Sequence, residues 1–216
     1  MRIVSLLFAC LLWNMTFGQK AVSKEISTLL TEGKPLQEVS LIHFVSNEVT
    51  NRSIPLEGLT KGTIVSIDEV AIEKLLNGNS DFIQLGLPLS ERQNLKLNLV
   101  RHEIFAEDFA LYTSGEPGIP FNYTPGAHYK GVVEGDPSSL VAVSVFNNEV
   151  MALISTGHGN MILGRIDNDR ESRHILYAEN DLDKTSGFEC STPDDGFGYT
   201  EEDLKPQAAG RDAGDC

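Results

Sequence analysis

The sequence predicts a mainly β protein: an antiparallel β-sandwich or a lipocalin-like barrel, with one short helix and a disordered acidic C-terminal linker. Short apolar or alternating segments recur at roughly 8–12-residue spacing over residues 37–182, which is typical of such folds. The connections between them are rich in Gly, Pro, Asn and Asp, the residues that form turns. Helical patterns are missing between most of these segments, which favours antiparallel pairing.

Residues 1–18 have the organisation of an export signal. Arg2 supplies a positive charge, Ile3 to Trp13 are mostly apolar, and a small residue, Gly18, precedes Gln19. The apolar segment is shorter than the roughly 20 residues that span a bilayer, and no later segment is longer. We therefore predict a secreted, cell-surface or periplasmic protein that has no transmembrane segment.

Residues 19–36 form an N-terminal extension before the β-rich region. This extension is polar, with a weak amphipathic turn around Ile26 and Leu29 that ends before Pro35. The one helix predicted with a start and a stop signal runs from Asp68, a good N-cap residue, to Leu76, and it is ended by Asn77 and Gly78.

The β-rich region, residues 37–182, contains the predicted strands. Their approximate ranges are 39–46, 63–67, 82–87, 95–105, 109–113, 128–134, 139–146, 149–155, 160–166 and 173–178. Asn147-Asn148 lies between two of them and predicts a two-residue hairpin, because Asn tolerates positive φ.

The C-terminal residues 183–216 lose this periodicity. From residue 179 onwards the chain has eleven acidic residues against three basic ones, and Gly and Pro are frequent. This composition predicts an exposed acidic linker without regular structure. We expect it to lead towards a catalytic domain that is missing from this sequence.

The composition also restricts what the chain does. A formal net charge of −14 repels phosphate backbones, so nucleic acid is not an expected partner. The histidines lack the His-Glu-x-x-His spacing of a zinc helix, and no Gly-x-Ser-x-Gly motif is present. We therefore predict no catalytic centre and no cofactor in this chain, which is not an enzyme by itself.

One segment goes beyond composition. Residues 128–144, HYKGVVEGDPSSLVAVS, resemble the signature of the reprolysin/ADAM-type zinc metallopeptidase propeptide. The residues that match are His128, Tyr129, Gly131, Gly135, Pro137 and Ser139. Read by themselves, the residues 135–138 predict a tight turn that sets the register of two strands, and Gly131 predicts a bulge or a close backbone approach.

The resemblance implies the pro-region of a secreted zinc metalloendopeptidase. Such a zymogen segment keeps the downstream hydrolase domain latent, assists its folding and is removed on activation. The partner would be the cognate metallopeptidase domain of the same polypeptide, and zinc would lie in that domain. Two other functions stay open: a stand-alone secreted β-sandwich that binds a carbohydrate or a protein, and a lipocalin-like carrier.

Two cysteines, Cys190 and Cys216, follow the export segment. The resemblance implies that Cys190 is a cysteine switch, whose thiolate binds the zinc of the downstream domain at the position a catalytic site leaves open. Ser191 follows it where the family has Gly. A disulfide between Cys190 and Cys216, or a free thiol, are the alternatives.

Overall fold

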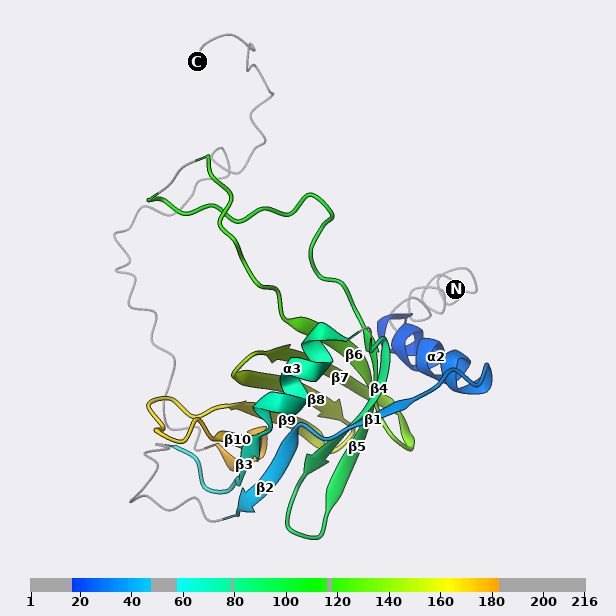
Figure 1. Ribbon diagram of the computed structural model, residues 1–216. Coiled ribbons are helices and arrows are strands. Elements are labelled where there is room, and N and C mark those ends of the chain that lie inside the picture. Colours follow the sequence, from blue (N-terminus) through cyan, green and yellow to red (C-terminus); the bar gives the residue numbers. More distant parts are fainter. Residues whose placement is uncertain (1–16, 48–57, 79, 116–117, 183–216) are drawn as a thin grey trace, which may run out of the picture. The chain divides into compact units, whose positions relative to one another are not determined.

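The computed structural model describes residues 17–47, 58–78, 80–115 and 118–182 (Figure 1). Ten strands form one curled mixed sheet, a half-barrel, which confirms the mainly β prediction. The strands are β1 (Gln37–Val39), β2 (Ile42–Ser46), β3 (Thr63–Ile67), β4 (Phe82–Pro88), β5 (Asn94–Arg101), β6 (Ala127–Val133), β7 (Asp136–Phe146), β8 (Glu149–Thr156), β9 (Gly159–Arg165) and β10 (His174–Ala178). A 3₁₀ turn, η2 (Glu179–Asp181), follows the last strand.

The sheet order is β1-β4-β5-β6-β7-β8-β9-β10-β3-β2, so β4 to β10 form a continuous antiparallel meander. The pairing of β1 with β4 is parallel and makes the sheet mixed. β1 and β2 lie at opposite ends of this order, although the chain between them has only Ser40 and Leu41. Because each residue extends a chain by at most about 3.6 Å, this short link draws the two edges together and curls the sheet.

Two strand predictions need correction in this region, and one hairpin prediction holds with a different turn conformation. The predicted strand 39–46 is two strands, because the chain leaves one edge and joins the other at Ser40 and Leu41. The segment 109–113 is not a strand, and only Thr113 forms an isolated bridge. The hairpin at Asn147-Asn148 is confirmed by the pairing of Phe146 with Glu149, but neither asparagine adopts a positive φ.

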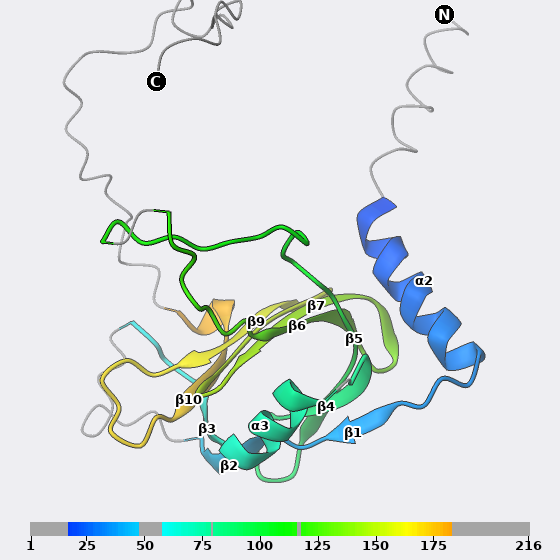
Figure 2. The same cartoon turned by 45° about the horizontal axis from the view of Figure 1, so that its top comes forward.

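Helix α3 (Glu69–Asn77) fills the concave side of the sheet (Figure 2). As predicted, Asp68 caps it: the Asp68 side chain accepts a hydrogen bond from the Ala71 N–H at 2.9 Å. Ile72 and Leu75 are buried against the inward side chains of the strands. The other large, fully buried members of this core are Leu41, Val65, Ile83, Leu85, Leu87, Leu97, Leu99, Ile154 and Leu163.

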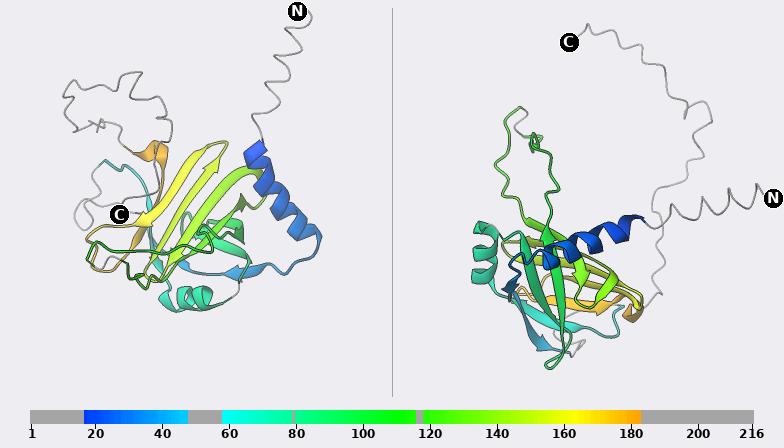
Figure 3. Two further views of the ribbon diagram at one scale, coloured as in Figure 1. Left: turned by 90° about the horizontal axis from the view of Figure 1, so that it is seen from above. Right: turned by 90° about the vertical axis from the view of Figure 1, so that its right-hand side faces the viewer.

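Helix α2 (Phe17–Thr31) packs beside β5, β6 and β7 and covers part of the other face of the sheet (Figure 3). Ile26 contacts Phe82 and Val132, and Glu25 pairs with Lys130 at 3.1 Å. The sequence predicted a weak turn here, and the structure has a helix of 15 residues. Tertiary burial of one apolar stripe stabilises a helix whose own amphipathic pattern is weak.

Candidate functional site

The residues of the propeptide-like motif build the β6–β7 hairpin. Its turn consists of Glu134 and Gly135, and Gly135 has a φ of 81°, which favours glycine. The predicted turn at residues 135–138 is therefore displaced: β7 already begins at Asp136 and includes Pro137. The displacement follows from the positive φ at Gly135, which lets the chain reverse within two residues.

Ser139 joins the two strands of this hairpin. Its side chain is fully buried, and its hydroxyl donates to the Asp136 carbonyl at 2.6 Å. The same oxygen accepts a hydrogen bond from the Val133 N–H at 2.8 Å. On the exposed side, the Asp136 carboxylate accepts from the Ser138 N–H and hydroxyl, and these bonds lower the pKa of Asp136. Ser139 therefore fixes the register of the motif.

At Gly131 the backbones of β5 and β6 approach each other closely. It lies opposite Leu99, and the register shifts between Gly131 and Val133. A Cβ atom at this position would overlap the Asn98 carbonyl oxygen. Gly131 was expected to mark a bulge or a close backbone approach, and the structure shows both.

Tyr129 and His128 complete the motif with one buried and one half-buried side chain. The Tyr129 hydroxyl donates to the Ser80 carbonyl at 3.1 Å, and burial raises its pKa. His128 Nδ1 lies 2.9 Å from the Ser144 hydroxyl, while its buried Nε2 has no hydrogen-bond partner. Burial lowers the pKa of His128, because the imidazolium would bury an unpaired N–H.

The connection between β5 and β6 projects from the end of the sheet (Figures 1 and 3). We call its described residues, 102–115 and 118–126, the arm. All of them from 106 to 125 are exposed. The arm nevertheless has seven large hydrophobic side chains in the solvent: Ile104, Phe109, Leu111, Tyr112, Ile119, Phe121 and Tyr123.

The root of the arm is an aromatic cluster. The Phe105 ring centroid is 4.4 Å from that of Phe109, 5.9 Å from that of Tyr123 and 6.0 Å from that of His128. His128 in turn lies 5.8 Å from Phe146 of β7. Phe105 and Phe109 are tilted against each other, and the other pairs are edge-to-face. Aromatic pairs each contribute about 0.5–1.5 kcal/mol, so the cluster attaches the arm to the motif hairpin.

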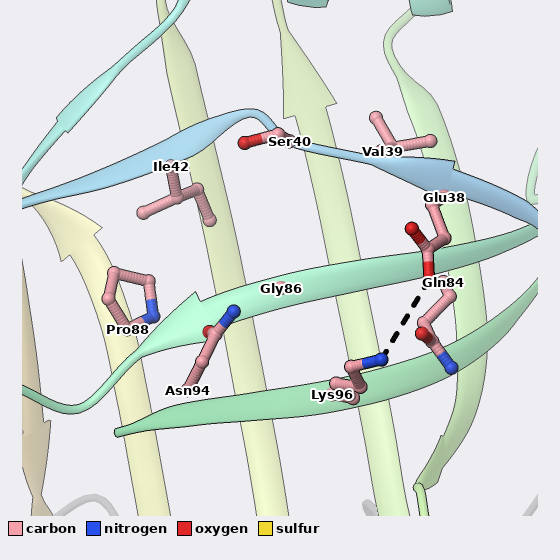
Figure 4. Close-up of a pocket in the computed structure, with 9 residues that line it drawn as sticks. All are labelled: Glu38, Val39, Ser40, Ile42, Gln84, Gly86, Pro88, Asn94 and Lys96. Atoms are coloured by element: carbon pink, nitrogen blue, oxygen red, sulfur yellow. Dashed lines mark ion pairs between the residues drawn. The ribbon is translucent and has the colours of Figure 1, made fainter. Parts of the chain in front are cut away.

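A pocket of about 380 Å³ lies at the corner where the sheet edges meet (Figure 4). Glu38 and Lys96 pair across it at 3.8 Å. The buried Gln84 amide donates to Asn98 Oδ1 at 2.9 Å and to Glu134 Oε1 at 3.0 Å. None of the residues that line the pocket is aromatic, so a sugar has no ring to stack on.

Cys190, the predicted cysteine switch, lies outside the described residues, as do Cys216 and residues 1–16 of the export segment. Within the part that the structure describes, no group of three or more metal-ligating side chains comes together. None of the helices in that part is long and apolar enough to cross a bilayer.

The comparisons with known proteins give no family for this chain. No protein-family model matches it, and no curated protein does.

Reasoning from the sequence missed the arm as a functional element. The signal was present: seven large apolar residues stand among Pro117, Pro120 and Pro125, without the alternation of a strand. A Pro-rich connection that retains so many aromatic and branched residues cannot bury them in a sheet, and it therefore exposes them.

Proposed function

We propose that this chain is the pro-region of a secreted zinc metalloendopeptidase, which keeps the downstream catalytic domain latent and assists its folding. The observation that carries the proposal is the motif of residues 128–144, with Gly131, Gly135, Pro137 and Ser139 in the register of the reprolysin/ADAM-type propeptide. The zinc belongs to the peptidase domain.

The structure supports this proposal because the motif residues stabilise the fold and carry out no chemistry. The motif residues lie in a rigid hairpin whose buried polar groups are largely paired, so they act as scaffold and not as a reactive centre. Inhibition by such a protein is binding that covers the active-site cleft, and it needs a folded surface and no chemistry of its own. Export by residues 1–18 agrees with a secreted zymogen.

The carrier alternative has less support. A carrier of the lipocalin type leaves a lumen for its ligand inside the barrel. Here α3 occupies the concave side, and Ile72 and Leu75 pack against the core residues of the strands. A stand-alone binding protein remains the second class, and the sequence that follows Cys216 separates it from a pro-region.

The experiment that tests the proposal starts with that downstream reading frame, where we expect His-Glu-x-x-His-x-x-Gly-x-x-His. Purified residues 19–216 should then inhibit the separately expressed peptidase domain at micromolar concentration. A peptidase domain that stays fully active under these conditions contradicts the proposal, as does a reading frame without a peptidase.

A variant of Cys190 extends this test. If its thiolate binds the zinc, Cys190→Ala weakens inhibition and leaves the β domain folded, and mercurials activate only the wild-type zymogen. A disulfide with Cys216 would close a loop of about 25 residues in the linker, and thiol counting on the unreduced protein detects it. A blocked Cys190 without a zinc–sulfur contact rejects the switch.

A further inference from the structure

We propose that the arm is the docking surface of this chain, and that its occupant is a surface of the peptidase domain with an apolar centre and a Lys/Arg rim. This inference rests on the proposed function and specifies where the contact is made. It follows from three features of the arm: its exposed apolar side chains, its charge and its anchored root.

The apolar side chains are concentrated where the fold does not need them. Ile119 and Phe121 are 61% and 56% exposed, and neither belongs to a core cluster of the described residues. Half of the large hydrophobic residues that are exposed in the described part lie on the arm. Contiguous exposed apolar groups mark interaction sites, and aromatic residues are enriched in the centres of protein interfaces.

The charge of the arm defines the occupant. Glu107 and Asp108 are acidic, Glu103 pairs with Arg101 at 3.1 Å, and no Lys or Arg occurs among the arm residues that the structure describes. A second copy would bring the same acidic arm and a net charge of −14 against it, and an anionic bilayer would repel it. A protein surface with basic residues around an apolar centre matches both properties.

The root restricts the freedom of the arm before binding. The aromatic cluster around Phe105 fixes its two ends to the hairpin. Higher up, the Phe121 N–H donates to the Leu111 carbonyl at 2.7 Å and joins the outgoing and returning segments. Less conformational entropy is then lost on docking, which is how a preorganised element gains affinity.

The test uses residues 19–216 with the peptidase domain of the proposed zymogen. The double variant Ile119→Ser/Phe121→Ser should weaken inhibition by about 30-fold, since truncating two central apolar anchors has effects of this size. The matched control is Met151→Ser/Leu153→Ser on β8, whose side chains are 48% and 51% exposed. The control should change inhibition by less than about twofold.

A fluorescent reporter identifies the occupant. The only tryptophan of the sequence, Trp13, lies in the export segment, so Tyr112→Trp creates a single tryptophan in residues 19–216. Its emission should shift to the blue when peptidase domain is added. A shift on raising the concentration of the chain alone, or on adding phosphatidylcholine vesicles alone, would assign the arm to self-association or to a membrane and overturn the proposal.

Reversing the charge of two arm residues tests whether the peptidase surface has a Lys/Arg rim. Glu107→Lys/Asp108→Lys should slow association with the peptidase domain several-fold at low salt and much less at high salt. An unchanged rate at low salt contradicts a basic rim.

The outcomes separate this inference from the proposed function. If wild-type residues 19–216 inhibit and the Ile119/Phe121 variant inhibits equally well, the arm is not the docking surface and the pro-region function stands. Equal weakening by the arm variant and the β8 control also rejects the arm. If the wild-type chain does not inhibit, the proposed function fails, and the role of the arm fails with it. Equal urea midpoints for all variants confirm that each of them is folded.

Discussion

The β6–β7 hairpin and the arm are adjacent in the chain and differ in almost every physical respect. In the hairpin, Ser139 is fully buried and both of its hydrogen bonds are made within the motif. In the arm, Ile119 and Phe121 are exposed to solvent and belong to no core cluster. The motif residues thus stabilise the fold, while the exposed apolar residues lie in a segment without a motif.

This difference predicts opposite responses to mutation. Changes in the hairpin should lower the free energy of unfolding, and changes in the arm should alter only binding.

The largest effect is expected for Gly131→Ala. The added Cβ overlaps the Asn98 carbonyl oxygen, and backbone cannot move aside as a flexible side chain does. We expect the free energy of unfolding to fall by about 3 kcal/mol or more, measured by urea denaturation. Gly157→Ala is the control, because nothing lies within 4 Å of its Cβ position. Similar losses for the two variants would show that Gly131 is not a special contact.

Ser139→Ala should have the second largest effect. The variant leaves the Val133 N–H without its acceptor in a buried position, and an unsatisfied buried group costs about 1–3 kcal/mol. Ser138→Ala removes an exposed hydroxyl and should change stability by less than about 0.5 kcal/mol. Urea midpoints of both variants check this, and a larger loss for Ser138 than for Ser139 contradicts the role of Ser139.

The third prediction concerns pH and the buried His174. The Ser172 carbonyl accepts from Nδ1 at 3.1 Å, so Nδ1 carries the proton and Nε2 accepts from the Val150 N–H at 3.2 Å. Protonation of Nε2 breaks the second bond, and burial accordingly lowers the pKa of His174. His128 of the motif has a pKa lowered by burial in the same direction.

Because both pKa values are lower in the folded state than the ordinary histidine value of about 6.5, the unfolded chain binds more protons at mildly acidic pH. Stability should therefore be fully present above about pH 6.5 and should decrease as the pH falls below it. Urea titrations between pH 8 and pH 5 measure this slope. His174→Gln should flatten it, because it removes the buried imidazole. A wild-type slope of zero would contradict the assignment.

Much of the fold could be predicted, because strand periodicity and turn residues are local signals. The strands predicted at 63–67 and 82–87, and the Asp68 cap of α3, follow directly from them and are confirmed. The link at Ser40 and Leu41 could not be predicted, since the meeting of two sheet edges depends on the whole order of strands. The length of α2 also depends on a distant partner, the outer face around Val132.

The candidate site was predicted less well than the fold, and for a physical reason. Motif residues such as Gly131 and Ser139 have roles in the backbone that a sequence pattern reports. The exposed apolar residues of the arm have no such role, because neither strand pairing nor packing in the core fixes their spacing. The sequence wrongly predicted a strand at 109–113, where the structure has one bridge residue, Thr113.

The smallest effect on stability is expected in the arm, and it is the most informative. Ile119→Ser/Phe121→Ser removes no core contact among the described residues, so the urea midpoint should shift by less than the equivalent of about 0.5 kcal/mol. Phe105→Ala is the contrasting variant, because its ring packs against Phe109, Tyr123 and His128 at the root. It should cost about 1–2 kcal/mol, since edge-to-face contacts are lost there. A large loss for the tip variant would mean that the arm folds back onto the sheet in solution, and its apolar residues would then serve the core and not a partner.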